Sequence, residues 1–328
     1  MRALVISAGG RLSVEDRPVP EPAADEVLVR VAGAGINRAD VLQRAGRYPA
    51  PPGVPADIPG LEFAGTVEAV GPEVAHPRPG DRVMGIVAGG GQAEYLTVAA
   101  AHCARVPPDL DLVEAGGIPE VYITAHDAMV VQGDLMTGQR VLIHAVASGV
   151  GTAAVQLARC LGATVVGTSR SKDKLDRAVD LGLDHPILVP SGFDPAAVAA
   201  EVTEAAGGPI DVTVDLVGGP YLAVDIAAAA PRGRIVIVGL IAGARHELDM
   251  GPLLAKRLTV RGTVLRSRPS AEKADATHLF EGQVVVPLLA RGAVRPVIDA
   301  VVPLAEAERG YDLVAADRTF GKVVLDLR

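Results

Sequence analysis

The spacing of hydrophobic and polar positions changes part-way along the chain. Residues 1–110 contain short alternating apolar runs at 3–6, 26–31 and 65–70, and prolines recur between these runs. Short strands separated by proline-rich loops are typical of small antiparallel β structures. The first part of the chain is therefore predicted to form a small antiparallel β barrel.

From about residue 112 onward, the pattern becomes an alternation of helices and strands. Near-continuous apolar runs at 141–144, 211–215 and 234–239 predict parallel strands that are buried on both faces. Helical periodicity follows the first of these runs, and a further helix is predicted at about 270–291. We therefore expect an α/β fold in which a doubly wound parallel sheet occupies the middle of the chain.

The segment 141–161 runs in the order strand, glycine turn, helix. Gly149 is expected to allow the turn, Gly151 to let the backbone approach a pyrophosphate, and Ala154 to let the helix pack closely on the strand. The helix N-terminus adds free N–H groups and a positive dipole end. A bare glycine pattern also occurs in ordinary strand–helix turns, but this order of elements favours a dinucleotide site.

The end of the next predicted strand, about 20 residues past the glycine turn, selects between the nicotinamide cofactors. An NAD site places Asp or Glu there, whereas this chain has Ser-Arg-Ser-Lys-Asp-Lys at 169–174. Hydroxyl, guanidinium and ammonium groups donate hydrogen bonds, which a 2′-phosphate needs. The alternative is a solvated basic helix start. We predict NADPH as the cofactor, bound by Ser169, Arg170, Ser171 and Lys174.

Composition limits the classes of partner. The chain has 328 residues, a formal net charge of -8 and 3% aromatic residues, so it can form two domains with aliphatic cores. The acidic balance argues against nucleic acid, and no apolar run has the length of a membrane helix. Two cysteines, Cys103 and Cys160, are a poor basis for a disulfide scaffold. We expect a cytoplasmic protein with no nucleic-acid or membrane partner.

Short motifs that point to one family occur in order along the whole chain. They are Asn37–Asp40, Pro59–Glu62, Gly80–Val83, Gly89–Tyr95, Leu142–Ala145, Ser148–Gly151 and Gly321–Val324. Together they resemble the zinc-free quinone oxidoreductase branch of the medium-chain dehydrogenase/reductase superfamily. The resemblance implies a GroES-like β-barrel catalytic domain from residues 1–115 and 263–328, a Rossmann domain from residues 116–262, and a homodimer formed through the cofactor domain.

Zinc members of this superfamily hold their catalytic metal with a Cys near the position of Asn37 and a His in a Gly-His-Glu motif. Here the second motif reads Gly60-Leu61-Glu62, and leucine cannot bind a metal. The four-cysteine lobe of the alcohol dehydrogenases has no counterpart, and the histidines are scattered without ligand spacing. We predict no metal. Without a Lewis acid, easily reduced acceptors are favoured, namely quinones or activated enones.

Two loop residues are candidates for contact with the substrate. Asn37 resembles a family residue near the nicotinamide ribose and could hydrogen-bond a substrate carbonyl, although a helix N-cap would suit it equally. Tyr48 resembles a family tyrosine of the cofactor and quinone site, and its phenol could donate to the developing oxyanion. The alternative for Tyr48 is a loop side chain packed on prolines. Glu62 is expected to be a structural acid.

The resemblance also assigns further contacts with the cofactor. The diphosphate would be lined by Ser148, Gly149, Val150 and Gly151, and the nicotinamide would be flanked by Gly239, Leu240 and Leu265. Lys322 matches a family position near the cofactor, but a basic residue that opens a final strand is also ordinary.

One position departs from the family. Relatives carry an Asn-Tyr pair whose tyrosine lies against the adenosine phosphate, and this chain has Leu188-Val189 there. Val189 has no group that can donate to a phosphate. Either Arg170 compensates, or the preference for NADPH is weaker than in relatives.

Three functions fit these features. The favoured one is an NADPH-dependent quinone oxidoreductase, in which positioning and exclusion of water dominate because the acceptor itself delocalises the charge. The second is an enoyl or alkenal reductase, which needs a proton donor that Tyr48 could supply. The third is an NADPH-binding module that signals redox state to a partner, and the motifs quoted above argue against it.

Overall fold

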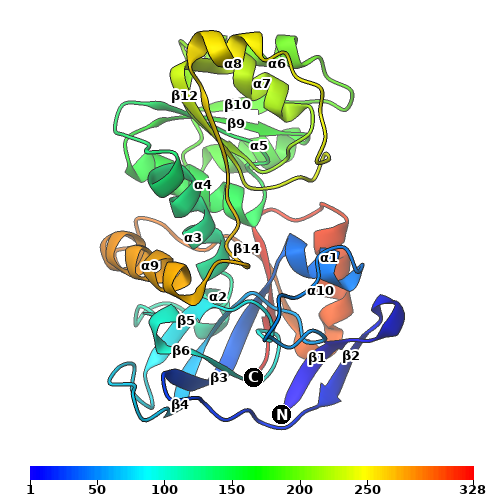
Figure 1. Ribbon diagram of the computed structural model, residues 1–328, viewed down its shortest axis with the longest axis vertical. Helices are drawn as coiled ribbons and strands as arrows, with labels where there is room; N and C mark the ends of the chain where they lie inside the picture. Colours follow the sequence, from blue (N-terminus) through cyan, green and yellow to red (C-terminus); the bar gives the residue numbers. More distant parts are fainter. The chain divides into compact units, whose positions relative to one another are not determined.

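The computed structural model describes residues 1–328, and the chain folds into two compact units. The first unit combines Met1–Ile123 with Leu265–Arg328, and the second is Thr124–Val264. In Figure 1 the blue-to-cyan and the orange-to-red parts of the chain belong to the first unit. The chain therefore leaves this unit once and later returns to it.

The first unit is built on a seven-stranded sheet in the order β14-β15-β3-β4-β5-β7, with β6 paired to β3. Neighbouring strands are antiparallel, except that β14 and β15 are parallel. Strands β1 and β2 form a separate antiparallel pair. The strands are β1 (Arg2–Ile6), β2 (Leu12–Asp16), β3 (Glu26–Ile36), β4 (Glu62–Val70), β5 (Arg82–Ile86), β6 (Tyr95–Ala99), β7 (Cys103–Arg105), β14 (Ile298–Pro303) and β15 (Lys322–Asp326).

Strand β3 is central to this sheet because it pairs with β15, β4 and β6. Its apolar side chains are buried, and Val29 shares a core cluster with Phe63 of β4 and Tyr311. Near its end, a Cβ on Gly35 would lie 2.2 Å from Glu62 Oε1. Glycine at this position leaves the space that the Glu62 carboxylate occupies.

Helices pack around this sheet. They are α1 (Arg38–Arg44), α2 (Leu112–Ala115), α9 (Ser270–Phe280) and α10 (Ala307–Ala315), and α3 (Pro119–His126) begins in the same unit. The helix predicted at about 270–291 is present as α9, which continues as wider π-helical turns over Glu281–Leu289. The helix predicted there is thus confirmed over Ser270–Leu289.

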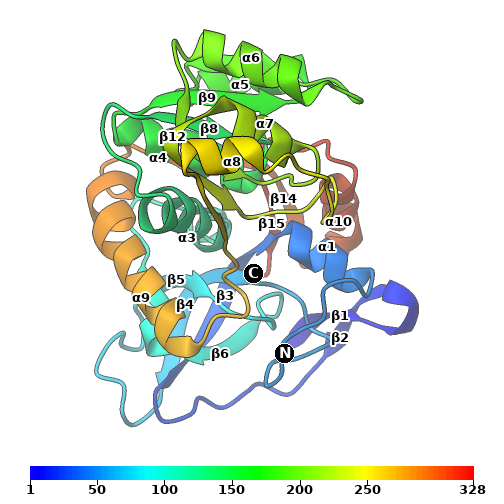
Figure 2. The same ribbon diagram turned by 45° about the horizontal axis from the view of Figure 1, so that its top comes forward.

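The second unit, green to yellow in Figure 2, contains a six-stranded parallel sheet in the order β10-β9-β8-β11-β12-β13. Its strands are β8 (Arg140–Ile143), β9 (Thr164–Ser169), β10 (His185–Leu188), β11 (Ile210–Asp215), β12 (Ala229–Ile237) and β13 (Thr259–Gly262). The order proceeds in one direction from β8 to β10 and in the other from β11 to β13. A doubly wound sheet with this reversal binds its ligand at the carboxyl ends of the strands beside the switch point.

Helices connect these parallel strands, because each pair of parallel neighbours needs a crossover connection. They are α4 (Gly149–Cys160), α5 (Lys172–Val179), α6 (Pro195–Ala205), α7 (Tyr221–Ala228) and α8 (Gly251–Lys256). Helices α6 and α7 share one apolar cluster with Leu142, Val166 and Ile187 of the sheet. The α/β class predicted from the sequence is confirmed. No helix in the structure combines the length and the apolarity needed to cross a bilayer.

Candidate active site

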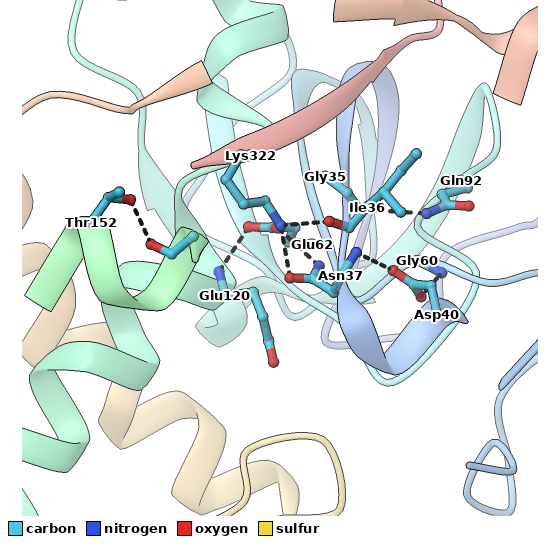
Figure 3. A network of polar contacts seen from close by, with 11 residues as sticks. Gly35, Ile36, Asn37, Asp40, Gly60, Glu62, Gln92, Glu120, Thr152 and Lys322 are labelled. Carbon is cyan, nitrogen blue, oxygen red and sulfur yellow. Dashed lines mark hydrogen bonds and ion pairs between the residues drawn. The ribbon is translucent and has the colours of Figure 1, made fainter. Parts of the chain in front are cut away.

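Lys322, the first residue of β15, carries a buried ammonium group that three oxygen atoms surround. Its Nζ lies 2.7 Å from Glu62 Oε1, 2.7 Å from Asn37 Oδ1 and 3.0 Å from the carbonyl oxygen of Ile36 (Figure 3). The side chain of Lys322 is 5% exposed and that of Glu62 is 0% exposed. Because an unpaired buried charge is costly, each member of this ion pair depends on the other.

Glu62 opens β4 and is held by more than the lysine. Its Oε1 accepts a hydrogen bond from Asn37 Nδ2 at 3.0 Å, and its Oε2 accepts one from the backbone N–H of Glu120 at 2.9 Å. The ends of β3, β4 and β15 and the start of α3 therefore meet at this one carboxylate. This is the structural role expected for Glu62.

Asn37 occupies the N-cap position of α1, and both the nitrogen and the oxygen of its side-chain amide make hydrogen bonds. Its Nδ2 donates to Glu62 and its Oδ1 accepts from Lys322, while its backbone N–H donates to Asp40 Oδ2 at 2.8 Å. Asp40 also accepts from the backbone N–H of Gly60 at 3.0 Å. Burial raises the pKa of Asp40 to about 6, although these backbone donors act to lower it. The contact of Asn37 with a substrate stays a prediction.

Tyr48 is placed by Arg266, a residue from the far end of the sequence. The Arg266 guanidinium lies 5.0 Å from the centre of the Tyr48 ring, and it donates to the backbone oxygens of Tyr48 at 3.2 Å and Ala88 at 2.8 Å. The same group donates to Gln43 Oε1 at 2.6 Å. Burial raises the pKa of the Tyr48 phenol, and the charge of Arg266 opposes this rise. The half-buried phenol is therefore a neutral donor at physiological pH, held from one face by a cation.

Glu120 was not singled out by sequence reasoning. It lies in the first turn of α3, half-buried, and Figure 3 shows its side chain pointing away from Glu62 while its backbone nitrogen faces that residue. Burial, followed by the negative charge of Glu62, raises the pKa of the Glu120 carboxyl to about 8, and Lys322 opposes the shift. The carboxyl is mostly protonated at neutral pH. A Glu at a helix start is an ordinary partner of the helix dipole, so nothing in the sequence indicates that this carboxyl is protonated.

The glycine turn of the second unit has a different geometry from the one expected. The residue with a left-handed backbone is Ala145, at φ 52°, whereas Gly149 already belongs to α4. The chain bends directly after β8, and Ser148 then caps the helix, with its Oγ accepting from the backbone N–H of Gly151 at 3.0 Å. The close approach expected at Gly151 is present, because a Cβ there would lie 2.4 Å from the carbonyl oxygen of Ala145.

The four predicted phosphate donors lie between the end of β9 and the first turn of α5. Ser169 ends β9, and its Oγ accepts from the backbone N–H of Ser171 at 3.2 Å. Ser171 in turn caps α5 by accepting from the backbone N–H of Lys174 at 3.4 Å. Arg170, between the two serines, is exposed. The segment therefore contains a helix start, and the binding of a 2′-phosphate by these residues stays a prediction.

The turns that follow β8 and β9 lie next to each other. The backbone N–H of Val146 donates to the carbonyl oxygen of Thr168, near the end of β9, at 3.1 Å, which joins the turn after β8 to the carboxyl end of β9. Val150 lies half-exposed in the first turn of α4. The structure thus brings the residues 148–151 and the residues 169–174 to one edge, where a dinucleotide binds in this architecture.

The remaining predicted contacts lie apart from these turns in the sequence. Gly239 follows β12, where a Cβ would lie 2.3 Å from the carbonyl oxygen of Leu216, and Leu240 beside it is 55% exposed. Leu265 opens the second segment of the first unit and is buried. Their contacts with a nicotinamide stay predictions. No three His, Cys, Asp or Glu side chains are grouped so that they could hold a metal ion.

Comparison with known proteins agrees with this architecture. Residues 23–108 match the family model of the alcohol dehydrogenase GroES-like domain, and residues 149–281 match that of the zinc-binding dehydrogenases. A quinone oxidoreductase of Pseudomonas aeruginosa is 32% identical over 96% of this chain and 95% of its own length. A quinone oxidoreductase of Sus scrofa is 30% identical over 94% of this chain and 92% of its own.

Solved structures give the same result. A mycobacterial protein in complex with NADPH superposes with a TM-score of 0.86 at 29% identity, covering 100% of both chains. The CurK enoyl reductase superposes with a TM-score of 0.85 at 26% identity, covering 100% of this chain and 98% of its own. From its fold, its motifs and these relatives, we conclude that the chain belongs to the medium-chain dehydrogenase/reductase superfamily of nicotinamide-dependent oxidoreductases.

Proposed function

We propose that this protein is an NADPH-dependent quinone oxidoreductase that works without a metal. The observation that carries the proposal is the position of Lys322, whose ammonium lies 2.7 Å from both Asn37 Oδ1 and Glu62 Oε1. Zinc members place a metal ligand near Asn37 and a His immediately before the Glu, where this chain has Leu61. A fixed positive charge between the remaining polar groups would repel a divalent cation. The quinone oxidoreductases among the relatives support the choice of acceptor.

The second unit offers the groups that an NADPH molecule needs. The backbone N–H groups at the start of α4, beside Ser148 and Gly151, would bind the diphosphate. Ser169, Arg170, Ser171 and Lys174 would bind the 2′-phosphate, since no carboxylate ends β9 to hold an unphosphorylated ribose. The reduced nicotinamide supplies a hydride when it is bound.

The first unit would orient the acceptor. The Tyr48 phenol, protonated and stacked on Arg266, donates a hydrogen bond to the oxygen on which negative charge develops. Asn37 and Lys322 act through Glu62 to fix the ends of β3, β4 and β15. Because a quinone spreads the incoming charge over its own two oxygens, no further electrophile is required.

A second function, reduction of a C=C bond conjugated to a carbonyl, is favoured by one observation. That reaction needs a proton donor as well as a hydride, and Glu120 carries a proton at neutral pH because its pKa is raised to about 8. The structural likeness to the CurK enoyl reductase agrees with this alternative.

We further propose that two copies of the chain associate through their second units. Strand β13 is an edge of the parallel sheet, with Val260 exposed, and an unpaired edge is a template for pairing with another chain. Nearby along the chain, Met250 is 70% exposed and Leu254 of α8 is 79% exposed. Light scattering should give the mass of a dimer. Val260→Lys should shift that mass toward the monomer, and a monomeric parent protein would overturn the proposal.

The test of function is the oxidation of NADPH, followed by its near-ultraviolet absorbance. The acceptors are an ortho-quinone, a para-quinone and an enone, each with and without EDTA, and NADH replaces NADPH in parallel. The proposal predicts that a quinone is reduced rapidly with NADPH. EDTA should leave this rate unchanged, and NADH should support only a slow rate. Turnover of the enone alone would establish the second function. Binding of NADPH with no turnover of any acceptor would favour a sensor of redox state.

A further inference from the structure

Val189, the residue directly after β10, has no polar role in this chain. It is fully buried in the apolar cluster that also contains Ile187, Val198 and Val202. A side chain in that position neither reaches solvent nor offers a donor. If the protein binds a 2′-phosphate with a phenol, the phenol must come from another element.

Tyr221, the first residue of α7, is such a phenol. Its ring is 7% exposed and packs edge-on against the ring of His144 at 4.7 Å and that of Phe193 at 4.9 Å between centroids. Its hydroxyl makes no hydrogen bond with the protein. The hydroxyl oxygen is not one of the buried side-chain atoms that lack a partner. The ring is therefore held by packing, while its hydroxyl remains open to a hydrogen-bond partner outside the chain.

The ring of Tyr221 rests on a rigid polar support. His144 Nδ1 lies 2.8 Å from Thr168 Oγ1, and His144 Nε2 lies 2.7 Å from Asp225 Oδ1, with all three side chains buried. Both ring nitrogens of His144 are thus occupied, which fixes the orientation of the imidazole. The Tyr221 ring that packs against it is fixed in turn, and this lowers the entropy that its hydroxyl would lose on binding a ligand.

Tyr221 lies close to the donor turn, because its ring packs on His144, whose Nδ1 is 2.8 Å from Thr168 Oγ1. Thr168, which holds His144, comes directly before Ser169 and Arg170 in the chain. The charge of Arg170 acts on the Tyr221 phenol and lowers its pKa, against the larger effect of burial that raises it. Tyr221 follows β11, and Arg170 follows β9, so both are presented at the carboxyl ends of strands beside the switch point.

We propose that the Tyr221 hydroxyl, together with Arg170, binds the 2′-phosphate of NADPH and supplies the donor that Val189 lacks. The inference rests on the proposed use of NADPH. Tyr221 acts as a determinant of cofactor specificity and takes no part in hydride transfer. A hydroxyl and a guanidinium that meet at one phosphate give charge-assisted hydrogen bonds, and these are the strong ones.

The test is isothermal titration of the full-length protein with 2′,5′-ADP and with 5′-AMP, two probes that differ only in the 2′-phosphate. Tyr221→Phe keeps the buried ring and removes the hydroxyl. We expect it to weaken the binding of 2′,5′-ADP by about tenfold or more and to leave the binding of 5′-AMP unchanged. Arg170→Ala should show the same selectivity. Tyr95→Phe, the same chemical change in β6 of the first unit, is the matched control and should alter neither affinity.

The outcomes separate this inference from the proposed function. A parent protein that prefers 2′,5′-ADP, with Tyr221→Phe keeping that preference in full, would overturn the role of Tyr221 and leave NADPH in place. An equal loss of affinity for both probes would assign the hydroxyl to the adenosine instead, and would also overturn it. A parent protein that binds both probes equally would overturn the use of NADPH and this inference together.

Discussion

Replacing Lys322 by methionine removes the ammonium from the centre of the polar cluster while keeping a side chain of similar length. Glu62 then loses its counterion, and Asn37 Oδ1 and the carbonyl oxygen of Ile36 lose their donor. The Glu62 carboxylate is 0% exposed, so water cannot replace the lysine without opening the ends of β3, β4 and β15.

The size of the effect follows from these contacts. Breaking a buried ion pair by removal of one partner costs about 3–5 kcal/mol. Glu62 keeps two donors, Asn37 Nδ2 and the backbone N–H of Glu120, and hydrogen bonds to a charged group contribute about 1.5–3 kcal/mol each. We therefore expect the lower end of that range, about 3 kcal/mol, for Lys322→Met. Adding Glu62→Gln removes the stranded charge, so the double variant should lose less than the sum of the single variants, with a coupling of about 2 kcal/mol.

Native-state hydrogen exchange followed by mass spectrometry measures the loss of local stability. Peptides from β3 and β15 report the opening of the first unit alone. Lys256→Met is the matched control: Lys256 donates only to the carbonyl oxygens of Ile226 and Ala227, in the second unit. It should leave the β3 and β15 peptides unchanged. A loss below about 1 kcal/mol for Lys322→Met, the level of an exposed pair, together with additive single and double variants, would refute the reasoning.

Three further predictions concern other parts of the structure. Gly151→Ala places a Cβ 2.4 Å from the carbonyl oxygen of Ala145, so the turn must shift; the melting temperature should fall and titration should show weakened NADPH binding, whereas parent-like binding would contradict the close approach. Glu120→Gln tests the raised pKa of Glu120, about 8 in the folded protein against an ordinary value of 4.5: the parent loses stability as the pH rises from about 4.5 through 8, because the unfolded chain releases this proton first. The difference in melting temperature, variant minus parent, should therefore rise between pH 4.5 and 8 and stay constant at higher pH. A difference that does not depend on pH would contradict the raised pKa of Glu120. Lys174→Ala should raise the KM for NADPH far more than that for NADH, and equal effects on both would remove Lys174 from the phosphate site.

Local patterns were sufficient for much of the fold. The parallel strands predicted at 141–144, 211–215 and 234–239 correspond to β8, β11 and β12. A strand that is buried on both faces needs consecutive apolar residues, and this pattern is visible in the sequence. The bend before α4 was assigned to the wrong residue. The glycine pattern suggests Gly149 as the residue that allows the bend. The left-handed backbone is instead at Ala145, in the short loop between β8 and the helix cap Ser148.

The candidate site was less accessible to sequence, because it depends on contacts between distant residues. Lys322 and Asn37 are separated by 285 positions, and Arg266 and Tyr48 by 218. No periodicity links such pairs, and the family resemblance alone placed Lys322 near the site. The raised pKa of Glu120 follows from burial, and the position of the Tyr221 ring follows from its packing on His144 and Phe193. Only the folded chain shows either feature.

The most direct test of the account is anaerobic single turnover. The protein, loaded with NADPH or with NADPH that carries deuterium at both C4 positions, is mixed rapidly with an ortho-quinone in the presence of EDTA, and the loss of reduced nicotinamide is followed. We predict that one equivalent of NADPH disappears per equivalent of quinone reduced, and that the deuterated cofactor reacts more slowly because the hydride itself is transferred. If the reduced nicotinamide remained unoxidised in the presence of the quinone, or if EDTA abolished the reaction, the protein would not be a metal-independent quinone oxidoreductase.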